Sequence, residues 1–226
     1  MASRPHLSRV DGPDDFAEAL KVPRETIHRL ARYADLLARW QRSTNLVAVS
    51  TLPTLWSRHF ADSAQIRDLA PEARLWLDLG SGAGFPGLVI AILQAGVPGF
   101  RMHLVESNQK KCAFLAEVAR ATNAPVDIHA MRIEELALND HMLVPDVVSA
   151  RALAPLPRLL ELAAPFFGVK TRGLFLKGRE AEAEIELARE AWAFNARLHP
   201  SLTAPDSHIV EVTALAPRPT ARRRAE

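Results

Sequence analysis

The sequence is poor in cysteine and lacks long apolar runs. Among its 226 residues Cys112 is the one cysteine, which excludes an internal disulfide and a multi-cysteine zinc site, and we expect no metal. The longest apolar stretches, such as residues 87–96, stop far short of the roughly 20 residues that a membrane span needs. Arg4 and Arg9 have no apolar segment behind them, so we expect no secretory signal, no membrane partner and a cytoplasmic location.

The sequence also lacks a large excess of charge of either sign, because its formal net charge is only +2 at pH 7. The basic residues are nevertheless unevenly placed, with seven in residues 21–58 and six in residues 151–179, where acids are few. They are Lys21, Arg24, Arg29, Arg32, Arg39, Arg42 and Arg58 in the first stretch and Arg151, Arg158, Lys170, Arg172, Lys177 and Arg179 in the second. Such clusters either form a polyanion-binding face or solvate the outer faces of helices, and the charge alone leaves both interpretations open.

Short apolar strands alternate with helical segments from residue 75 onward. The expected strands are 75–79, 102–105, 126–130, 146–149 and 173–177, followed by a terminal hairpin of 192–198 and 209–213. The expected helices between them are 86–94, 108–122, 157–167 and 181–191. This alternation predicts a doubly wound, mostly parallel seven-stranded α/β sheet with helices on both faces.

A basic helical extension precedes the predicted sheet. We expect a mobile tail over residues 1–12, a helix from Pro23 to about Arg42 and a second helical stretch over residues 51–68. The chain is therefore predicted to comprise an N-terminal helical extension (1–72), a sheet domain (73–215) and a basic tail (216–226) that carries Arg222, Arg223 and Arg224.

A glycine-rich loop follows the first predicted strand. Residues 78–87 read Asp-Leu-Gly-Ser-Gly-Ala-Gly-Phe-Pro-Gly, and the loop opens a helix whose free N–H groups could hold a carboxylate. Gly82, Gly84 and Gly87 satisfy the dinucleotide pattern G-x-G-x-x-G, so an NAD(P)-dependent oxidoreductase is an alternative.

Three features of this loop favour S-adenosylmethionine over NAD(P). A tighter G-x-G-x-G at residues 80, 82 and 84 begins directly after Asp78-Leu79. Pro86 stands where a phosphate-facing helix would present an N–H, and the basic extension precedes the sheet. A P-loop is excluded because no Gly-Lys-Ser/Thr follows.

Glu106 ends the second predicted strand, 19 residues after Gly87. Its carboxylate can accept hydrogen bonds from both hydroxyl groups of a ribose, which is the role expected at this position of a nucleotide-binding sheet. A surface acid without a ligand is the alternative.

Six segments together resemble the bacterial 16S ribosomal RNA guanine-N7 methyltransferases, also called glucose-inhibited division protein B. The resemblance is carried by Asn45-Leu46-Val47, Arg58-His59-Phe60-Ala61-Asp62-Ser63, residues 78–87, Lys110-Lys111-Cys112-Ala113-Phe114-Leu115, Arg132-Ile133-Glu134-Glu135 and Ser149-Ala150-Arg151-Ala152. They occur in order over about residues 45–177, and the Gly-Phe-Pro-Gly and Arg-His-x-x-Asp-Ser segments are the most specific of them.

This resemblance implies a class I, Rossmann-like methyltransferase that uses S-adenosylmethionine. It implies methylation of N7 of a guanine in the 530 loop of 16S rRNA (guanine 527), with 16S rRNA or the small ribosomal subunit as the partner, and we expect a monomer. The cofactor contacts that it implies are Gly80, Phe85, Ile133, Glu134 and Arg151, to which the loop and strand pattern add Gly82 and Glu106. Glu106 stands where the family often has Asp, and its side chain is longer.

The expected chemistry needs no general base, because guanine N7 has a free lone pair and carries no proton. We therefore predict no catalytic residue in that sense, with Arg151 as a possible positioning group, and a nearby carboxylate could stabilise the charge that develops on the base. Arg58, Arg151 and Lys177 are candidates for phosphate contacts, and His59 and Asp62 are interpreted as structural. A noncatalytic RNA-binding protein is the remaining alternative.

Overall fold

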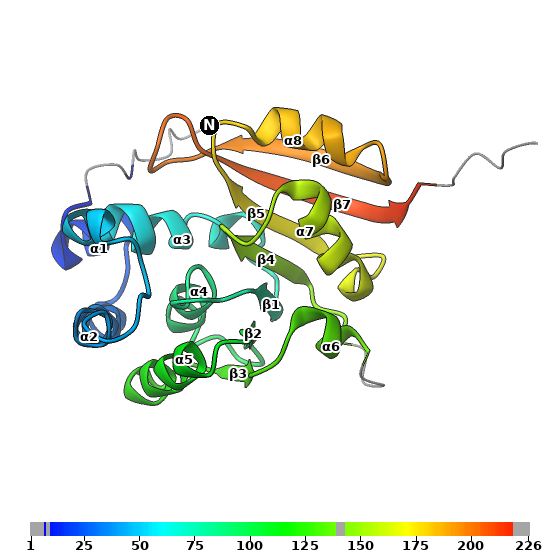
Figure 1. The fold of residues 1–226 in the computed structure, drawn as a ribbon. Helices are drawn as coiled ribbons and strands as arrows, with labels where there is room; N and C mark the ends of the chain where they lie inside the picture. Colours follow the sequence, from blue (N-terminus) through cyan, green and yellow to red (C-terminus); the bar gives the residue numbers. More distant parts are fainter. Residues whose placement is uncertain (1–6, 8–9, 139–142, 219–226) are drawn as a thin grey trace, which may run out of the picture.

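The computed structural model describes residues 7, 10–138 and 143–218, and one twisted sheet runs through its centre (Figure 1). Its seven strands follow the order β3-β2-β1-β4-β5-β7-β6. They are β1 (Leu75–Leu79), β2 (Arg101–Val105), β3 (Val126–His129), β4 (Val147–Arg151), β5 (Arg172–Lys177), β6 (Trp192–Pro200) and β7 (His208–Pro217). Strands β1 to β5 are parallel, whereas β7 is antiparallel to β5 and to β6. The predicted doubly wound, mostly parallel seven-stranded sheet is confirmed.

Helices cover both faces of the sheet (Figure 1). On one face lie α4 (Gly87–Leu93) and α5 (Gln109–Thr122), with α2 (Arg24–Trp40) packed on these two helices and α1 (Pro13–Leu20) packed on α2. On the other face lie α6 (Ile133–Ala137), α7 (Leu156–Ala163) and α8 (Ala181–Ala188). Successive strand side chains point to opposite faces, so Trp76 belongs to the first core and Leu77 to the second. No helix among the described residues is long and apolar enough to cross a membrane.

The N-terminal extension shares its core with the sheet. The inner face of α2 buries Leu30 and Tyr33 completely, in the same cluster as Trp76 and Phe114. The apolar spacing that predicted this helix is thus the spacing of its buried face. Its basic side chains lie mainly outward, which leaves them accessible to solvent.

The second predicted helical stretch is divided into short turns. A 3₁₀ helix, η2 (Val49–Thr54), contains Pro53 and leads into a π-helix, η3 (Trp56–Ala61). A short α3 (Asp62–Ala64) and a 3₁₀ turn, η4 (Arg67–Leu69), complete the stretch. Proline lacks the N–H that a regular α-helix would use, which accounts for the irregular start.

The structure corrects the prediction of a mobile N-terminal tail. Leu7 and Val10 are buried at 1% and 2% exposure, and the Leu7 N–H donates to the Leu202 carbonyl at 2.8 Å. Apolar side chains in this segment therefore cover the core, while residues 1–6 and 8–9 lie outside the described part. At the other end, β7 continues to Pro217, and Arg222, Arg223 and Arg224 lie outside the described residues.

Candidate cofactor and substrate site

The carboxyl ends of β1 and β4 lie side by side at the point where the chain order of the sheet reverses. From β1 the sheet continues to β2 and β3 on one side and to β4 and β5 on the other. Ligands of doubly wound sheets bind at such a switch point, beyond the strand ends. Gly80 follows β1 here and Arg151 ends β4, so the topology brings two predicted site residues to one edge.

The glycine loop has a backbone that other residues rarely adopt. Gly80, Gly82 and Gly84 have φ of +64°, +58° and +92°, in the left-handed region that favours glycine. A Cβ on Gly84 would lie 2.5 Å from a methyl carbon of Leu88. The Tyr33 hydroxyl, from α2, donates a hydrogen bond to the Ala83 carbonyl and so ties the extension to the loop.

Asp78 holds the glycine loop in place through hydrogen bonds that its carboxylate accepts. Its Oδ1 accepts a hydrogen bond from the Ser149 hydroxyl at 2.7 Å, and its Oδ2 accepts the Gly87 N–H at 3.3 Å. Burial raises the pKa of this carboxyl to about 6, although the hydrogen bonds from Ser149, Ser81 and Gly87 and the charge of Arg151 oppose the shift. The acid at the strand end is therefore a structural clamp between β1, β4 and α4.

Glu106 holds the loop from the side. Its Oε2 accepts the Gly82 N–H at 2.9 Å and its Oε1 accepts the Asn108 N–H at 2.8 Å. Each carboxylate oxygen has two lone-pair positions, so both oxygens can accept a further hydrogen bond from a ribose hydroxyl. At 9% exposure Glu106 is a buried group at the rim of a cavity, which disfavours the alternative of a surface acid.

A cavity of about 340 Å³ opens between the loop, the end of β2 and the start of α6. Five of the seven predicted cofactor contacts line it: Gly80, Gly82, Glu106, Ile133 and Glu134. Its other lining residues include Lys111, Met131, Arg132 and Leu153, none of which was named as a cofactor contact from the sequence. Helix α6, which carries Ile133 and Glu134, was also missed, because a five-residue helix gives almost no periodic signal.

Phe85 does not line this cavity. Its ring is 4% exposed and stacks on Tyr33 with the centroids 5.3 Å apart. The guanidinium of Arg151 lies over the Phe85 ring at 5.0 Å, and His59 lies beside it at 4.9 Å. In this structure Phe85 packs the loop and supports Arg151, and its contact with a cofactor stays a prediction.

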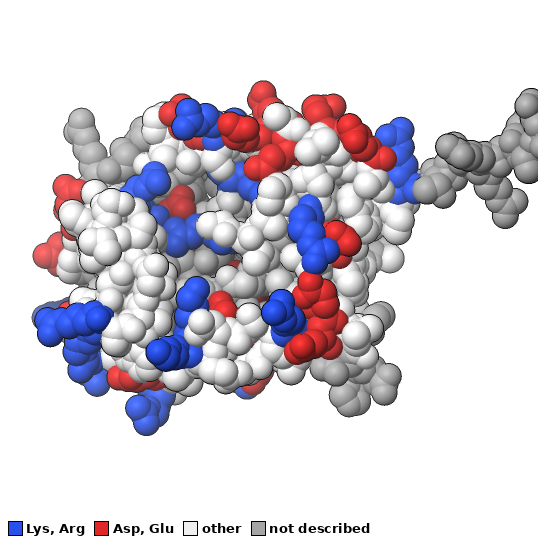
Figure 2. Space-filling model, in the orientation of Figure 1, with Lys and Arg blue, Asp and Glu red and all other residues white. Residues whose placement is uncertain are grey.

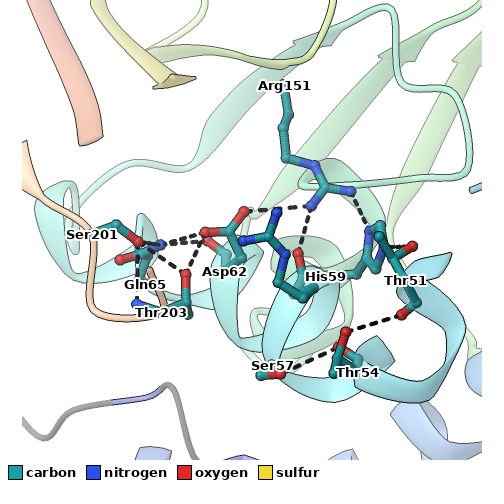
Figure 3. Close-up of polar contacts among 10 residues, drawn as sticks. Thr51, Thr54, Ser57, His59, Asp62, Gln65, Arg151, Ser201 and Thr203 are labelled. Atoms are coloured by element: carbon teal, nitrogen blue, oxygen red, sulfur yellow. Dashed lines mark hydrogen bonds and ion pairs between the residues drawn. The ribbon is translucent and has the colours of Figure 1, made fainter. Parts of the chain in front are cut away.

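Arg151 lines a second, larger cavity of about 630 Å³. Ala152 lines both cavities, so they meet just beyond the end of β4. The Arg151 guanidinium donates to the Arg58 carbonyl at 3.0 Å and to His59 Nδ1 at 2.7 Å (Figure 3). These contacts and the Phe85 ring fix the guanidinium at the junction between the two cavities.

His59 is a neutral acceptor in this arrangement. A guanidinium only donates, so Nδ1 accepts from Arg151 and Nε2–H donates to the Thr51 hydroxyl at 2.8 Å. Burial and, to a lesser extent, the charges of Arg151 and Arg58 together lower the pKa of His59 to about 3. The interpretation of His59 as structural fits this geometry.

Asp62 stands on the other side of Arg151 (Figure 3). Its Oδ2 lies 3.4 Å from Arg151 Nη1, and its Oδ1 accepts from Gln65 Nε2 at 2.9 Å and from the Thr203 hydroxyl at 2.7 Å. Sequence reasoning missed Gln65, Ser201 and Thr203. Their contacts join residues up to 141 positions apart, for which the chain has no local signal.

Lys177 and Arg58 differ as candidates for phosphate contacts. The Lys177 ammonium is buried and donates to the Ala154 carbonyl at 2.6 Å and to Glu184 Oε2 at 2.7 Å, so its charge is already paired. Arg58 is exposed at the edge of the larger cavity. Figure 2 shows basic atoms over α2 and α5 and within the central hollow, whereas acidic atoms predominate over α8.

Comparisons with solved structures agree with the fold. A putative O-methyltransferase from Klebsiella pneumoniae aligns with a TM-score of 0.58 at 13% identity, covering 92% of this chain and all of that one. Fibrillarin from Aeropyrum pernix, solved with S-adenosyl-L-methionine, aligns at 0.54 and 14% identity over 70% of this chain and 75% of that one. The sheet order, the glycine loop and the acid after β2 place the chain in the Rossmann-like methyltransferase fold class.

Sequence comparisons resolve this class further. The pattern of the family described as rRNA small subunit methyltransferase G matches residues 26–210. The protein of that name from Parvibaculum lavamentivorans is 54% identical over 203 residues, which is 89% of each chain. Its counterpart from Rhodospirillum centenum is 50% identical over 205 residues, 90% of this chain and 91% of that one. The chain belongs to the rRNA small subunit methyltransferase G family.

Proposed function

We propose that this protein transfers the methyl group of S-adenosylmethionine to N7 of a guanine in the 530 loop of 16S rRNA, at position 527. The observation that carries the proposal is the family match over residues 26–210 together with a cavity at the switch point that the family's motifs line. The same match disfavours the NAD(P)-dependent oxidoreductase, since the family is one of methyltransferases.

The small cavity fits the proposed cofactor. The N–H groups of the glycine loop would hold the methionine carboxylate, Glu106 the ribose, and Ile133 and Glu134 the adenine end. S-adenosylmethionine, when bound, supplies an electrophilic methyl group on a sulfonium. Phe85 supports the loop and Arg151 stands at the junction between the cavities, which is where we expect them to act on the cofactor.

The protein's task is alignment rather than proton transfer. Guanine N7 attacks with its own lone pair, so the residues need to hold the base with N7 facing the methyl carbon and keep water out. The rigid loop and the clamped Arg151 provide a surface that need not reorganise during the reaction.

Mass-spectrometric mapping of 16S rRNA tests the proposal directly. RNA from cells that lack the protein should carry unmethylated guanine at position 527, and expression of the wild-type chain should restore 7-methylguanine there. Calorimetry on the purified protein should show binding of S-adenosylmethionine and none of NADH. An unchanged rRNA methylation pattern, or RNA binding without methyl transfer, would overturn the assignment and favour a noncatalytic RNA-binding role.

We further propose that the partner is 16S rRNA within the small ribosomal subunit or one of its assembly forms, bound by a cytoplasmic monomer. The exposed basic residues of α2 and Arg58 support an RNA-facing surface beside the larger cavity. Light scattering on the purified chain and cell fractionation check the oligomeric state and the location.

A further inference from the structure

The larger cavity carries side chains of both charges. Arg58, Arg151 and Lys177 face it together with two carboxylates, Asp62 and Glu184, and Lys177 is paired with Glu184. A phosphate would be repelled by the carboxylates, whereas a nucleobase edge that offers both donors and acceptors matches such a lining. Its volume of about 630 Å³ lies in the range of ligand sites, and it adjoins the proposed cofactor cavity at Ala152.

The two carboxylate oxygens of Asp62 differ in the hydrogen bonds that they accept. Oδ1 accepts two short hydrogen bonds, from Gln65 and Thr203, whereas Oδ2 has only the 3.4 Å contact with Arg151 among the described residues. The carboxylate is therefore held firmly on one side while its other oxygen keeps free lone pairs. The Asp62 side chain is only 18% exposed, so Oδ2 has few other hydrogen-bond donors within reach.

Glu184 is less suited to meet a base that is being methylated. Its Oε2 accepts from both Lys177 and the Leu156 N–H, so, like Asp62, it has one fully engaged oxygen and a cationic partner, and the two acids differ in their position. Lys177 ends β5, which is one strand further than β4 from the glycine loop. Asp62 contacts Arg151 at the end of β4, the strand adjacent to β1, and so lies nearer to the place where the methyl group would be.

We propose that Asp62 reads the target base, with Oδ2 accepting hydrogen bonds from N1–H and the N2 amino group of guanine. This inference rests on the proposed function. The contacts lie on the Watson–Crick edge, so N7 on the opposite edge stays free to face the cofactor cavity. Arg151 is held beside this carboxylate, with N–H groups that have no partner among the described residues and match the O6 acceptor.

The contact also acts on the reaction itself. The N7 lone pair forms a bond to the methyl carbon, the carbon–sulfur bond breaks, and its electron pair stays on sulfur, giving S-adenosylhomocysteine. The base gains a positive charge that makes N1–H a stronger donor, so its hydrogen bond to Asp62 strengthens as the transition state forms. Asp62 is thus expected to raise kcat as well as to select guanine.

The test compares guanine with inosine, which lacks the N2 amino group, at position 527 of semisynthetic 16S rRNA in reconstituted small-subunit particles. Wild-type protein should methylate guanine at least tenfold better in kcat/KM than inosine. Asp62→Asn should lose at least tenfold in kcat/KM on guanine, and its ratio of guanine to inosine should fall toward one. Gln65 and Thr203 both donate to Oδ1, so they turn the asparagine oxygen toward themselves and place its amide nitrogen where Oδ2 stood.

Three matched variants separate reading of the base from structural support. Asp68→Asn, at an exposed acid outside both cavities, should leave kcat/KM and the ratio unchanged. His59→Gln loosens Arg151 without removing the carboxylate and should lower kcat while keeping the ratio. Glu184→Gln should keep the ratio too. Calorimetry with S-adenosylmethionine should give the same affinity for Asp62→Asn as for the wild type.

The inference is overturned if Asp62→Asn keeps the wild-type ratio, or if Glu184→Gln abolishes it. If Asp62→Asn does not fold, the wild-type measurement still decides, because equal rates on guanine and inosine exclude a carboxylate at N2. Failure of the proposed function looks different, since the wild-type protein would then not methylate the guanine particles at all.

Discussion

The two adjoining cavities are built in different ways. The smaller is shaped by backbone, through a loop of consecutive residues whose φ angles only glycine adopts readily, and is held by Asp78 and Glu106 at neighbouring strand ends. The larger is shaped by side chains from η3, β4 and the turn between β6 and β7, joined by a chain of hydrogen bonds through Arg151 and Asp62. The cofactor side should therefore fail when a single charged side chain is added to the loop, whereas the substrate side should lose activity in graded steps as its side chains are changed.

The largest effect is expected for Gly80→Asp. The new Cβ would lie 2.6 Å from a terminal carbon of the Leu153 side chain, which can move, so the protein should still fold. The carboxylate would enter the small cavity and repel that of methionine, and affinity for S-adenosylmethionine in calorimetry should fall at least a hundredfold. Gly99→Asp is the matched control, because Gly99 also has positive φ (+75°) but lies in open space outside both cavities. Equal losses in the two variants would mean that backbone strain, not the cavity, is responsible.

Asp78, which lies beside the backbone-built cavity, should make the protein's free energy of unfolding fall as the pH rises. Its pKa is raised to about 6 in the folded protein, so its contribution is fully present below the unfolded value of 3.8 and is lost as the pH passes through 6. Between pH 4 and 7 the wild type should lose roughly 2–3 kcal/mol in the free energy of unfolding relative to Asp78→Asn. Urea denaturation of both proteins across this range measures the difference. A difference that stays flat with pH would contradict the raised pKa.

Arg151→Lys probes the side-chain-built cavity. A lysine cannot lie flat on the Phe85 ring and at the same time donate to His59 and to the Arg58 carbonyl, so the group at the junction loses its fixed position. We expect kcat/KM for methylation of small-subunit particles to fall roughly 10- to 100-fold, since lost hydrogen bonds to charged groups cost about 1.5–3 kcal/mol. Arg197→Lys, on an exposed part of β6, should have no effect. Wild-type activity in Arg151→Lys would show that charge alone suffices at this position.

The smallest effect is expected on the outer surface of α2 and of the turn that follows it. Arg39 and Arg42 are exposed, and neither lines a cavity. Reversing both to Glu should weaken RNA binding several-fold and lower the salt slope by about two units, one for each lost phosphate contact, while leaving affinity for S-adenosylmethionine unchanged. The same reversal at Arg189 and Arg197 is the control for net charge. If both double variants bind RNA alike at two salt concentrations, α2 is not part of the RNA surface.

Much of the sheet could be predicted because its strands carry their signal locally. The strand over residues 75–79 has the predicted bounds. Asn108, the first residue of the predicted helix 108–122, caps α5 by accepting hydrogen bonds from the N–H groups of Lys110 and Lys111. Helix α1 was missed although Pro13 and the acids of its first turn give a start signal. Its eight residues fall between the expected tail over residues 1–12 and the helix expected from Pro23, and so short a helix gives a weak periodic signal. The position of β3 at the edge and of β1 at the centre follows from topology rather than from any strand's own sequence.

The sequence by itself determined the glycine loop, the acids at the ends of β1 and β2 and the family, because each depends on residues that are adjacent or regularly spaced along the chain. Only the tertiary structure decided that Phe85 lies beneath Arg151, that Lys177 is paired with Glu184, and that Asp62 has one free oxygen. These contacts join residues that are far apart in the chain, and no local pattern encodes them. They form because the helices and the terminal hairpin of β6 and β7 fold back onto one edge of the sheet. Burial there leaves each polar group few hydrogen-bond partners.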